Sequence, residues 1–273
     1  MAPQPSIHLP LSNRASQAYE RGRVARVGPP PWSLENTPSS FRNQATTQGR
    51  TPLRGWALFS GISSRGREEI VRVARKCEFR RGHTIHVEGD PVRQVVLLMS
   101  GSAKLVQLGQ NGTEVILRLC GPGELVGTIG MASQVLHCAT AQALRPCEAL
   151  VWDIRGFDLL FQRFQELRLN TALILVKQLK DMDDRFREIC TECAASRLSH
   201  QIMRLIDQVG YRKNGAVQID ISREELAQLI GATMYTVSRL VAEWDKKGIV
   251  RAGRGTVSVQ NLKELEHLSQ NIC

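Results

Sequence analysis

Residues 233–239 combine side chains that are unusual for an exposed helical face. They are three hydroxyl groups, a phenol, a long apolar chain and one guanidinium: Thr233, Met234, Tyr235, Thr236, Ser238 and Arg239. Exposed faces mostly carry Lys and Glu, whereas these groups are the types that contact base edges and phosphates of DNA. Arg239 is the best candidate for a bidentate contact to O6 and N7 of guanine. The alternative is an ion pair with Glu243, one helical turn later.

Two further arginines follow in a segment with turn-forming glycines. Short alternating apolar runs in 250–259 flank a turn, and Arg251 and Arg254 lie beside it. This pattern predicts a two-stranded wing whose arginines neutralise backbone phosphates.

A helix-turn-helix is predicted to position these groups. Ser222 and Glu225 have the spacing of a capping box, so a helix should run from Arg223 to about Ile230. Gly231 marks the turn, and Thr233 can cap a second helix. The inner residues of that helix are Val237, Leu240, Val241 and Trp244. We therefore predict that 195–273 is a winged helix-turn-helix DNA-binding domain.

The preceding segment has apolar residues at heptad spacing on an otherwise charged helix. They are Leu175, Leu179, Met182, Phe186, Ile189 and Cys193. A stripe this narrow predicts that 157–194 is a dimerisation helix, although packing onto the chain's own core is an alternative. Cys190 and Cys193 would share one face of this helix. That spacing raises the hypothesis of a redox or metal switch, against plain apolar packing of the two thiols.

Between Phe79 and Asp153 the sequence consists of short apolar runs separated by turn residues. Asn111-Gly112 between two such runs is the strongest hairpin signal. We predict an antiparallel β-roll of jelly-roll type over 51–156, with a helical stretch from Leu53 to about Phe79. The fold class is thus α+β: β-roll, long dimerisation helix and winged helix-turn-helix.

Composition supports a folded chain with an unfolded end. The chain has 273 residues, 42% hydrophobic and 23% charged, which excludes wholesale disorder. Residues 1–50 hold most of the prolines and no apolar period, and we predict a disordered basic tail. The net charge of +10 favours a polyanionic partner. No membrane span or signal peptide is visible, so we expect a cytoplasmic protein with no membrane partner, whose seven cysteines are mainly free thiols.

Several motifs together resemble the Crp/Fnr family of bacterial transcription regulators, from about Leu53 to Leu265. They are Gly82…Val87-Glu-Gly-Asp-Pro91, Gly101-Ser-Ala-Lys104, Gly121-Pro-Gly-Glu-Leu125 and Ser222-Arg-Glu-Glu-Leu-Ala…Gly231…Thr236-Val-Ser-Arg239. The resemblance implies a cyclic-nucleotide-binding-like sensor and a homodimer on a two-fold symmetric DNA site. It also implies RNA polymerase as a partner and no enzymatic activity.

The effector site departs from the family pattern. Gly123-Glu124 match the pair that holds the ribose of cyclic AMP, but His137-Cys138 stand where the phosphate-binding Arg-Ser pair belongs, and Met182-Asp183 replace hydroxyl residues of the dimer helix. We expect no tight binding of cyclic AMP, because a buried phosphate needs a charged donor. A regulator of the usual cyclic-AMP type remains the alternative.

Other cofactors are disfavoured as well. Residues 1–76 contain no cysteine, which argues against the family's N-terminal iron–sulfur cluster. Haem would need His83, His86 or His137, and a lone histidine is usually structural. No metal site is predicted, and a jelly-roll metalloenzyme, the alternative from another class, lacks its ligands. The sequence leaves the effector and the target genes open, as well as whether the protein activates or represses.

The recognition helix also differs from the family pattern. Many members carry Arg-Glu where this chain has Met234-Tyr235, while Ser238-Arg239 match. We expect a half-site related to the family's consensus but not identical to it.

Overall fold

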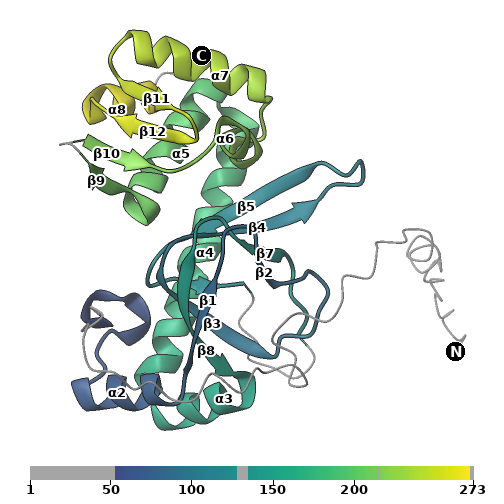
Figure 1. Ribbon diagram of the computed structural model, residues 1–273, viewed down its shortest axis with the longest axis vertical. Helices are drawn as coiled ribbons and strands as arrows, with labels where there is room; N and C mark the ends of the chain where they lie inside the picture. Colours follow the sequence, from purple (N-terminus) through teal and green to yellow (C-terminus); the bar gives the residue numbers. More distant parts are fainter. Residues whose placement is uncertain (1–52, 128–134, 214–215, 271–273) are drawn as a thin grey trace, which may run out of the picture. The chain divides into compact units, whose positions relative to one another are not determined.

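A computed structural model of the chain describes residues 53–127, 135–213 and 216–270 (Figure 1). The predicted tail, 1–50, lies outside the described residues. The rest of the chain, Thr51–Cys273, groups into one unit.

Two four-stranded antiparallel sheets form the N-terminal part of this unit. The first has the order β1-β8-β3-β6: β1 (Arg75–Phe79), β8 (Cys147–Asp153), β3 (Gln94–Ser100) and β6 (Leu125–Val126). The second has the order β2-β7-β4-β5: β2 (Thr84–His86), β7 (Thr140–Ala143), β4 (Ala103–Leu108) and β5 (Glu114–Cys120). Apolar side chains of both sheets share one buried core, for example Leu98 and Ala141. The predicted β-roll is confirmed.

The hairpin between β4 and β5 lies where Asn111-Gly112 predicts it. Gly112 has a φ of 78°, a conformation that L side chains rarely adopt. The amide of Thr113 donates to the side-chain oxygen of Asn111 at 3.1 Å, and the amide of Gly109 donates to the carbonyl of Thr113 at 2.8 Å. These bonds close the turn.

The segment before the β-roll is only partly helical. It forms two 3₁₀ turns, η1 (Leu53–Gly55) and η2 (Ala57–Phe59), and one helix, α2 (Ser64–Arg72), which the Ser63 side chain caps. The predicted helical pattern through Phe79 is wrong at its end, because residues 75–79 pair with β8. Tertiary strand pairing therefore overrides the local pattern there.

Two helices follow the β-roll. α3 (Ile154–Arg163) and α4 (Gln165–Thr191) are separated at Phe164, whose φ of −115° and ψ of 95° are not helical. The long helix therefore begins at Gln165 and not at 157. Phe157 of α3 and Leu167 of α4 pack with Trp152 in a second core beside the first sheet.

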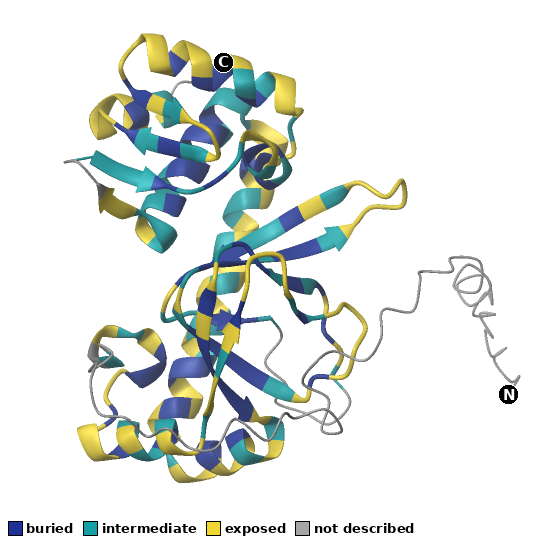
Figure 2. Ribbon diagram, viewed as in Figure 1, coloured by how far each residue is buried: buried dark blue, intermediate teal, exposed yellow. Residues whose placement is uncertain are grey.

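Within its described residues, 194–213 and 216–270, the C-terminal part has four helices and four strands. The helices are α5 (Ala194–Val209), α6 (Arg223–Ile230), α7 (Met234–Lys246) and α8 (Leu262–Gln270). The sheet has the order β11-β12-β10-β9: β11 (Val250–Gly253), β12 (Thr256–Val259), β10 (Ala216–Ile219) and β9 (Tyr211–Lys213). Figure 2 shows buried positions along one side of these helices and exposed positions along the other. This arrangement confirms the predicted winged helix-turn-helix.

None of the helices in the described ranges is long and apolar enough to cross a membrane.

Candidate nucleic-acid interface

The turn between α6 and α7 is fixed by side-chain caps. The amide of Glu225 donates to Ser222 Oγ at 3.1 Å, and the amide of Ser222 donates to Glu225 Oε2 at 2.7 Å, which completes the predicted capping box. Gly231 ends α6 in the left-handed conformation (φ 62°, ψ 45°). Thr233 Oγ1 then accepts from the amide of Thr236 at 3.1 Å and starts α7. The direction of α7 is therefore set locally by these three bonds and one glycine.

One side of α7 is buried and the other faces solvent. The predicted inner residues are buried: Val237, Leu240, Val241 and Trp244. On the other side, Tyr235 is 77% exposed, and Thr233, Met234 and Arg239 are also exposed. Thr236 and Ser238 are half-buried at the edges. The six predicted contact residues thus lie on or beside one solvent-facing surface.

Arg239 keeps its guanidinium available. Glu243, its partner in the alternative interpretation, accepts a hydrogen bond from Lys247 Nζ at 2.7 Å instead. That bond, with the charges of Lys247 and Arg239, lowers the pKa of the Glu243 carboxyl. Within the described ranges Arg239 makes no hydrogen bond or ion pair, so its planar fork is free to approach a base edge.

The predicted wing is present beside α7. β11 and β12 pair from Val250↔Val259 to Gly253↔Thr256, and Arg254 lies in the turn between them. Both Arg251 and Arg254 are exposed. The amide of Ala252 donates to the Asp245 carboxylate at 3.4 Å, which connects the wing to the end of α7.

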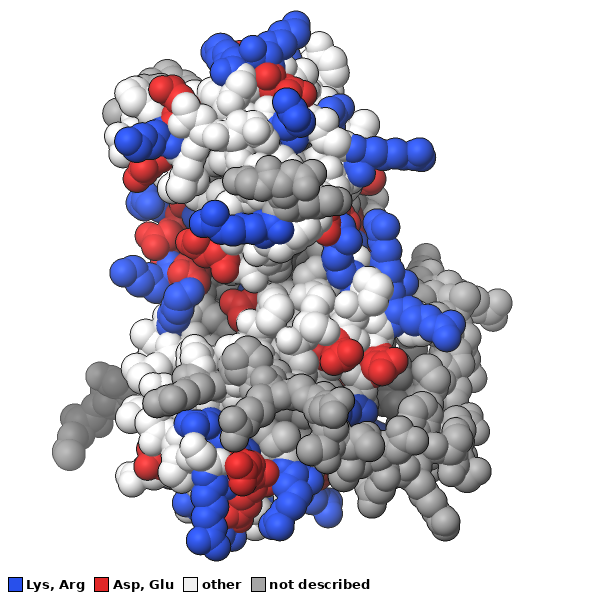
Figure 3. Space-filling model, turned by 60° about the vertical axis from the view of Figure 1, so that its left-hand side comes forward, with Lys and Arg blue, Asp and Glu red and all other residues white. Residues whose placement is uncertain are grey.

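Basic and acidic side chains lie close to one another on one face of the molecule. On the face drawn in Figure 3, acidic side chains are interspersed among the basic ones, with no single large basic patch.

The two residues predicted to hold a ribose, Gly123 and Glu124, contact other residues of the same chain. Gly123 has a φ of 84°, and a Cβ there would lie 2.7 Å from the indole of Trp56. The carboxylate of Glu124 accepts a hydrogen bond from the amide of Gly121 at 2.8 Å. Among the described residues, no hydrogen bond or ion pair joins Glu124 to His137.

His137 stacks on His86, a pairing that the sequence could not reveal. The ring centroids are 3.7 Å apart and the planes differ by 9°. His137 is 6% exposed, and His86 Nε2 and His137 Nδ1 are buried without a hydrogen-bond partner among the described residues. Burial, reinforced by His137, lowers the pKa of His86 to about 3, and burial lowers the pKa of His137 although Asp90 opposes it. Both rings are therefore neutral at pH 7.

The remaining pocket and cofactor candidates do not gather into a metal site. Cys138 and His83 are exposed. Among the residues that the structure describes, no group of three or more His, Cys, Asp or Glu side chains could hold a metal ion.

The apolar stripe of α4 differs from the predicted dimer seam at its start. Leu179, Met182, Phe186 and Ile189 are exposed, with Phe186 at 71%. Leu175 instead packs against the core of the chain's own β-roll. The exposed stripe continues toward the N-terminus through three residues that the heptad pattern missed, Leu169, Leu173 and Val176. Their helical spacing of four and three residues was the available signal.

The cysteine pair is not on one helical face. α4 ends at Thr191, and Glu192 (φ −117°, ψ 152°) and Cys193 (φ −74°, ψ 165°) are extended. Cys193 is the N-cap of α5 and is disulfide-bonded, whereas Cys190 is an exposed free thiol. The two are therefore not bonded to each other, and the prediction that Cys193 continues the seam is wrong, because the helix ends before it.

Comparison with known proteins agrees with this geometry. The sequence model of the cyclic nucleotide-binding domain matches residues 76–164, and that of the Crp-like helix-turn-helix domain matches residues 196–268. The cyclic AMP receptor protein of Thermus thermophilus is 27% identical and covers 80% of this chain and 98% of its own length. The CRP-like cAMP-activated global transcriptional regulator of Mycobacterium tuberculosis is 22% identical, over 76% of this chain and 94% of its own.

Solved structures share the fold. FixK2 from Bradyrhizobium japonicum has a TM-score of 0.65 at 18% identity and covers 74% of this chain and 100% of its own. A Crp/Fnr-family regulator from Thermus thermophilus has a TM-score of 0.63 at 21% identity, with 73% and 100% covered. Together the two domain matches span more than half of the residues. The chain therefore belongs to the Crp/Fnr family, whose members are transcription regulators with a DNA-binding helix-turn-helix and are not enzymes.

Proposed function

We propose that two copies of this chain bind a two-fold symmetric site in double-stranded DNA, with α7 of each copy in the major groove. The observation that carries the proposal is the exposed face of α7, on which Arg239 makes no hydrogen bond or ion pair among the described residues. Arg239, Tyr235 and Met234 would contact base edges. Arg251 and Arg254 on the wing would contact phosphates. Half-site centres should lie about 10 base pairs apart.

The test begins with selection of a binding site from random DNA by the full chain. Arg239→Ala should then weaken binding to the selected site by about 10- to 100-fold and relax the preference at one base pair per half-site. Arg72→Ala, at an exposed arginine at the end of α2, removes the same charge away from α7 and should leave both unchanged. Unchanged affinity and preference in Arg239→Ala would refute the proposed guanine contact.

The dimer is supported by the exposed stripe on α4. Large exposed apolar side chains that continue along one helix mark an interface, and a second copy of the same helix matches them in chemistry. Phe186→Glu should convert the protein to a monomer in sedimentation equilibrium and abolish binding to the full site. Leu159→Glu, at an exposed leucine of α3 outside the stripe, is the control. A dimer that persists in Phe186→Glu would place the interface elsewhere.

The effector is proposed not to be cyclic AMP, although the names of two relatives include it. His137 is neutral, buried and stacked on His86, so it cannot supply the charge that the phosphate needs. A calorimetric titration of the full chain with cyclic AMP should show no binding in the low micromolar range. Heat of binding in that range would favour the second candidate, a cyclic-AMP-responsive regulator. RNA polymerase is proposed as a further partner on the family resemblance alone.

A further inference from the structure

One side chain of the long helix, Arg185 of α4, hydrogen-bonds to both the β-roll and the DNA-binding part. Its Nη1 donates to the carbonyl oxygen of Leu117 in β5, and its Nη2 donates to that of Leu229 in α6 at 2.9 Å. Among the described residues, no other side chain of α4 hydrogen-bonds to both parts. The guanidinium therefore links three elements that are distant in the sequence.

The acceptor on the β-roll lies at the edge of a sheet. β5 is the last strand of its sheet, and its pairing with β4 shifts so that Arg118 lies opposite Leu105 but Ile116 lies opposite Val106. Leu117 is thus the extra residue of a β-bulge. Such a residue is left out of the regular ladder, so its carbonyl is available to a donor from another element.

The acceptor in the DNA-binding part lies at the end of α6. Leu229 precedes Ile230, the last residue of α6, and the turn at Gly231 leads directly to α7. The last carbonyls of a helix have no partner within the helix, and a cation there also interacts favourably with the helix dipole. Arg185 therefore holds the turn from which α7 starts.

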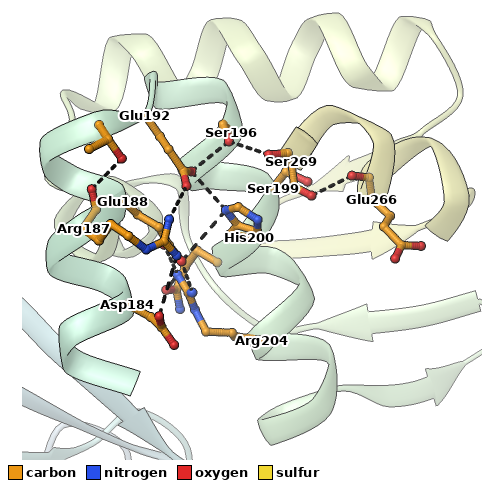
Figure 4. A network of polar contacts seen from close by, with 12 residues as sticks. Asp184, Arg187, Glu188, Glu192, Ser196, Ser199, His200, Arg204, Glu266 and Ser269 are labelled. Atoms are coloured by element: carbon orange, nitrogen blue, oxygen red, sulfur yellow. Dashed lines mark hydrogen bonds and ion pairs between the residues drawn. The ribbon is translucent and has the colours of Figure 1, made fainter. Parts of the chain in front are cut away.

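Arg185 makes no ion pair among the described residues. Two carboxylates act on it through their charge, Glu188 and Asp181. Arg204 binds both oxygens of Glu188 at 2.7 Å (Figure 4), and Lys177 binds Asp181 at 3.2 Å. Burial lowers the pKa of Arg185 to about 10, so the group is still charged at pH 7. A half-buried charge with neutral acceptors adds little stability, whereas two bonds from one rigid planar group fix geometry well.

This link lies next to the apolar stripe that is proposed as the dimer interface. Phe186 follows Arg185 directly and is 71% exposed, and the exposed Ile189 lies one helical turn after Arg185. The same two turns of α4 therefore carry the stripe and the link. The position of a second copy against the stripe would thus reach the start of α7 through one side chain.

We propose that Arg185 is a positioning residue for DNA binding: it fixes α7 relative to α4 and so determines which distance between the two half-sites the dimer accepts. The inference rests on the proposed function, because it requires two copies on one two-fold symmetric site. One additional base pair between the half-sites moves one of them by about 3.4 Å and turns it by about 35° around the DNA. Apolar contacts also join the two parts, but they are non-directional, so they resist such a rotation less than two hydrogen bonds do.

Binding to a series of DNA duplexes tests the inference. Each duplex carries two copies of the half-site selected by the full chain, with centres about 8 to about 12 base pairs apart. The spacing ratio is the affinity for the best spacing divided by the affinity for a spacing one base pair longer. Arg185→Met keeps a long stem and removes both donors, and it should lower the ratio about tenfold, as expected for the loss of hydrogen bonds from a charged donor. Arg185→Lys keeps the charge but not the planar fork and should lower the ratio less.

Arg187→Met is the matched control. Arg187 is an exposed arginine of the same helix that pairs with Asp184 and Glu192, so this variant loses one charge without removing the link and should keep the wild-type ratio. A purely structural role of Arg185 would lower Tm and weaken binding at every spacing alike, without a change in the ratio. An unchanged ratio in Arg185→Met would therefore overturn the inference. Selection of single, unpaired half-sites would instead refute the two-fold symmetric site, and the role of Arg185 with it.

Discussion

At the residue scale, hydrogen bonds within α7 decide which of its groups remain for DNA. Thr233 Oγ1 accepts from the amide of Thr236 and lies 2.9 Å from Thr236 Oγ1. One of these hydroxyls donates to the other, so the pair has one O–H left for a phosphate. Thr233 is therefore first a helix cap, and its contact with DNA is shared with Thr236. Arg239 is free of such a structural role.

The buried histidine pair makes stability depend on pH. The folded-state pKa of His86 is about 3, far below the 6.5 of an exposed histidine, so the unfolded chain binds more protons between these values. Stability should therefore fall as pH decreases below about 6.5. The loss should reach roughly 2 kcal/mol at pH 5 from His86 alone.

Urea unfolding at a series of pH values measures this effect. His86→Phe keeps a ring for the stack but cannot be protonated, so its stability should vary less between pH 7.5 and pH 5. His83→Asn, at an exposed histidine nearby, should keep the wild-type profile. An unchanged pH profile in His86→Phe would contradict the prediction, whatever the variant's absolute stability.

At the element scale, the capping box determines where α6 begins. Ser222→Ala removes the acceptor for the Glu225 amide and should destabilise the fold by about 1 kcal/mol. Chemical denaturation checks the value. Ser222→Asp retains a capping oxygen and should recover most of the loss, whereas an equal loss in both variants would argue against a capping role.

Some of the helices and turns could be predicted from the sequence, and others could not. Short-range signals were sufficient to predict α6, α7 and the β4–β5 turn from the sequence, because helix caps and glycines in the left-handed conformation act on residues only a few positions away. An apolar residue of α4 can pack either on the chain's own core or on a partner helix. The spacing of these residues alone could not assign Leu175 to the chain's own core. The end of α4 carries no Pro or Gly to mark it before Cys193. The His86–His137 stack joins residues 51 positions apart and left no local pattern.

At the scale of the whole molecule, the β-roll and the DNA-binding part share one core. Four residues of the roll, Val106, Ile116, Leu119 and Leu144, belong to the cluster that contains the inner faces of α5, α6 and α7. Arg145 of the roll also pairs with Asp220 at 2.8 Å. The two parts should therefore unfold together.

Scanning calorimetry of the full chain should show one cooperative transition for residues of both parts. Leu119→Ala leaves a cavity in the shared core and should cost about 2–5 kcal/mol, lowering Tm without splitting the transition. Leu108→Ala, at an exposed position on the hairpin, should change Tm little. Two resolved transitions in the wild type would show that the parts unfold independently.

Gly121 lies at the point where these parts meet. A Cβ at this position would fall on the backbone carbonyl oxygen of Gln208 at the end of α5, and a backbone atom cannot move aside as a flexible side chain can. Every missense change at this codon adds a Cβ and so must push the two parts away from each other. In a genetic screen for altered regulation, substitutions at Gly121 should therefore share one phenotype regardless of the new side chain, and compensating second-site changes should map to the loop after β5 and to the end of α5.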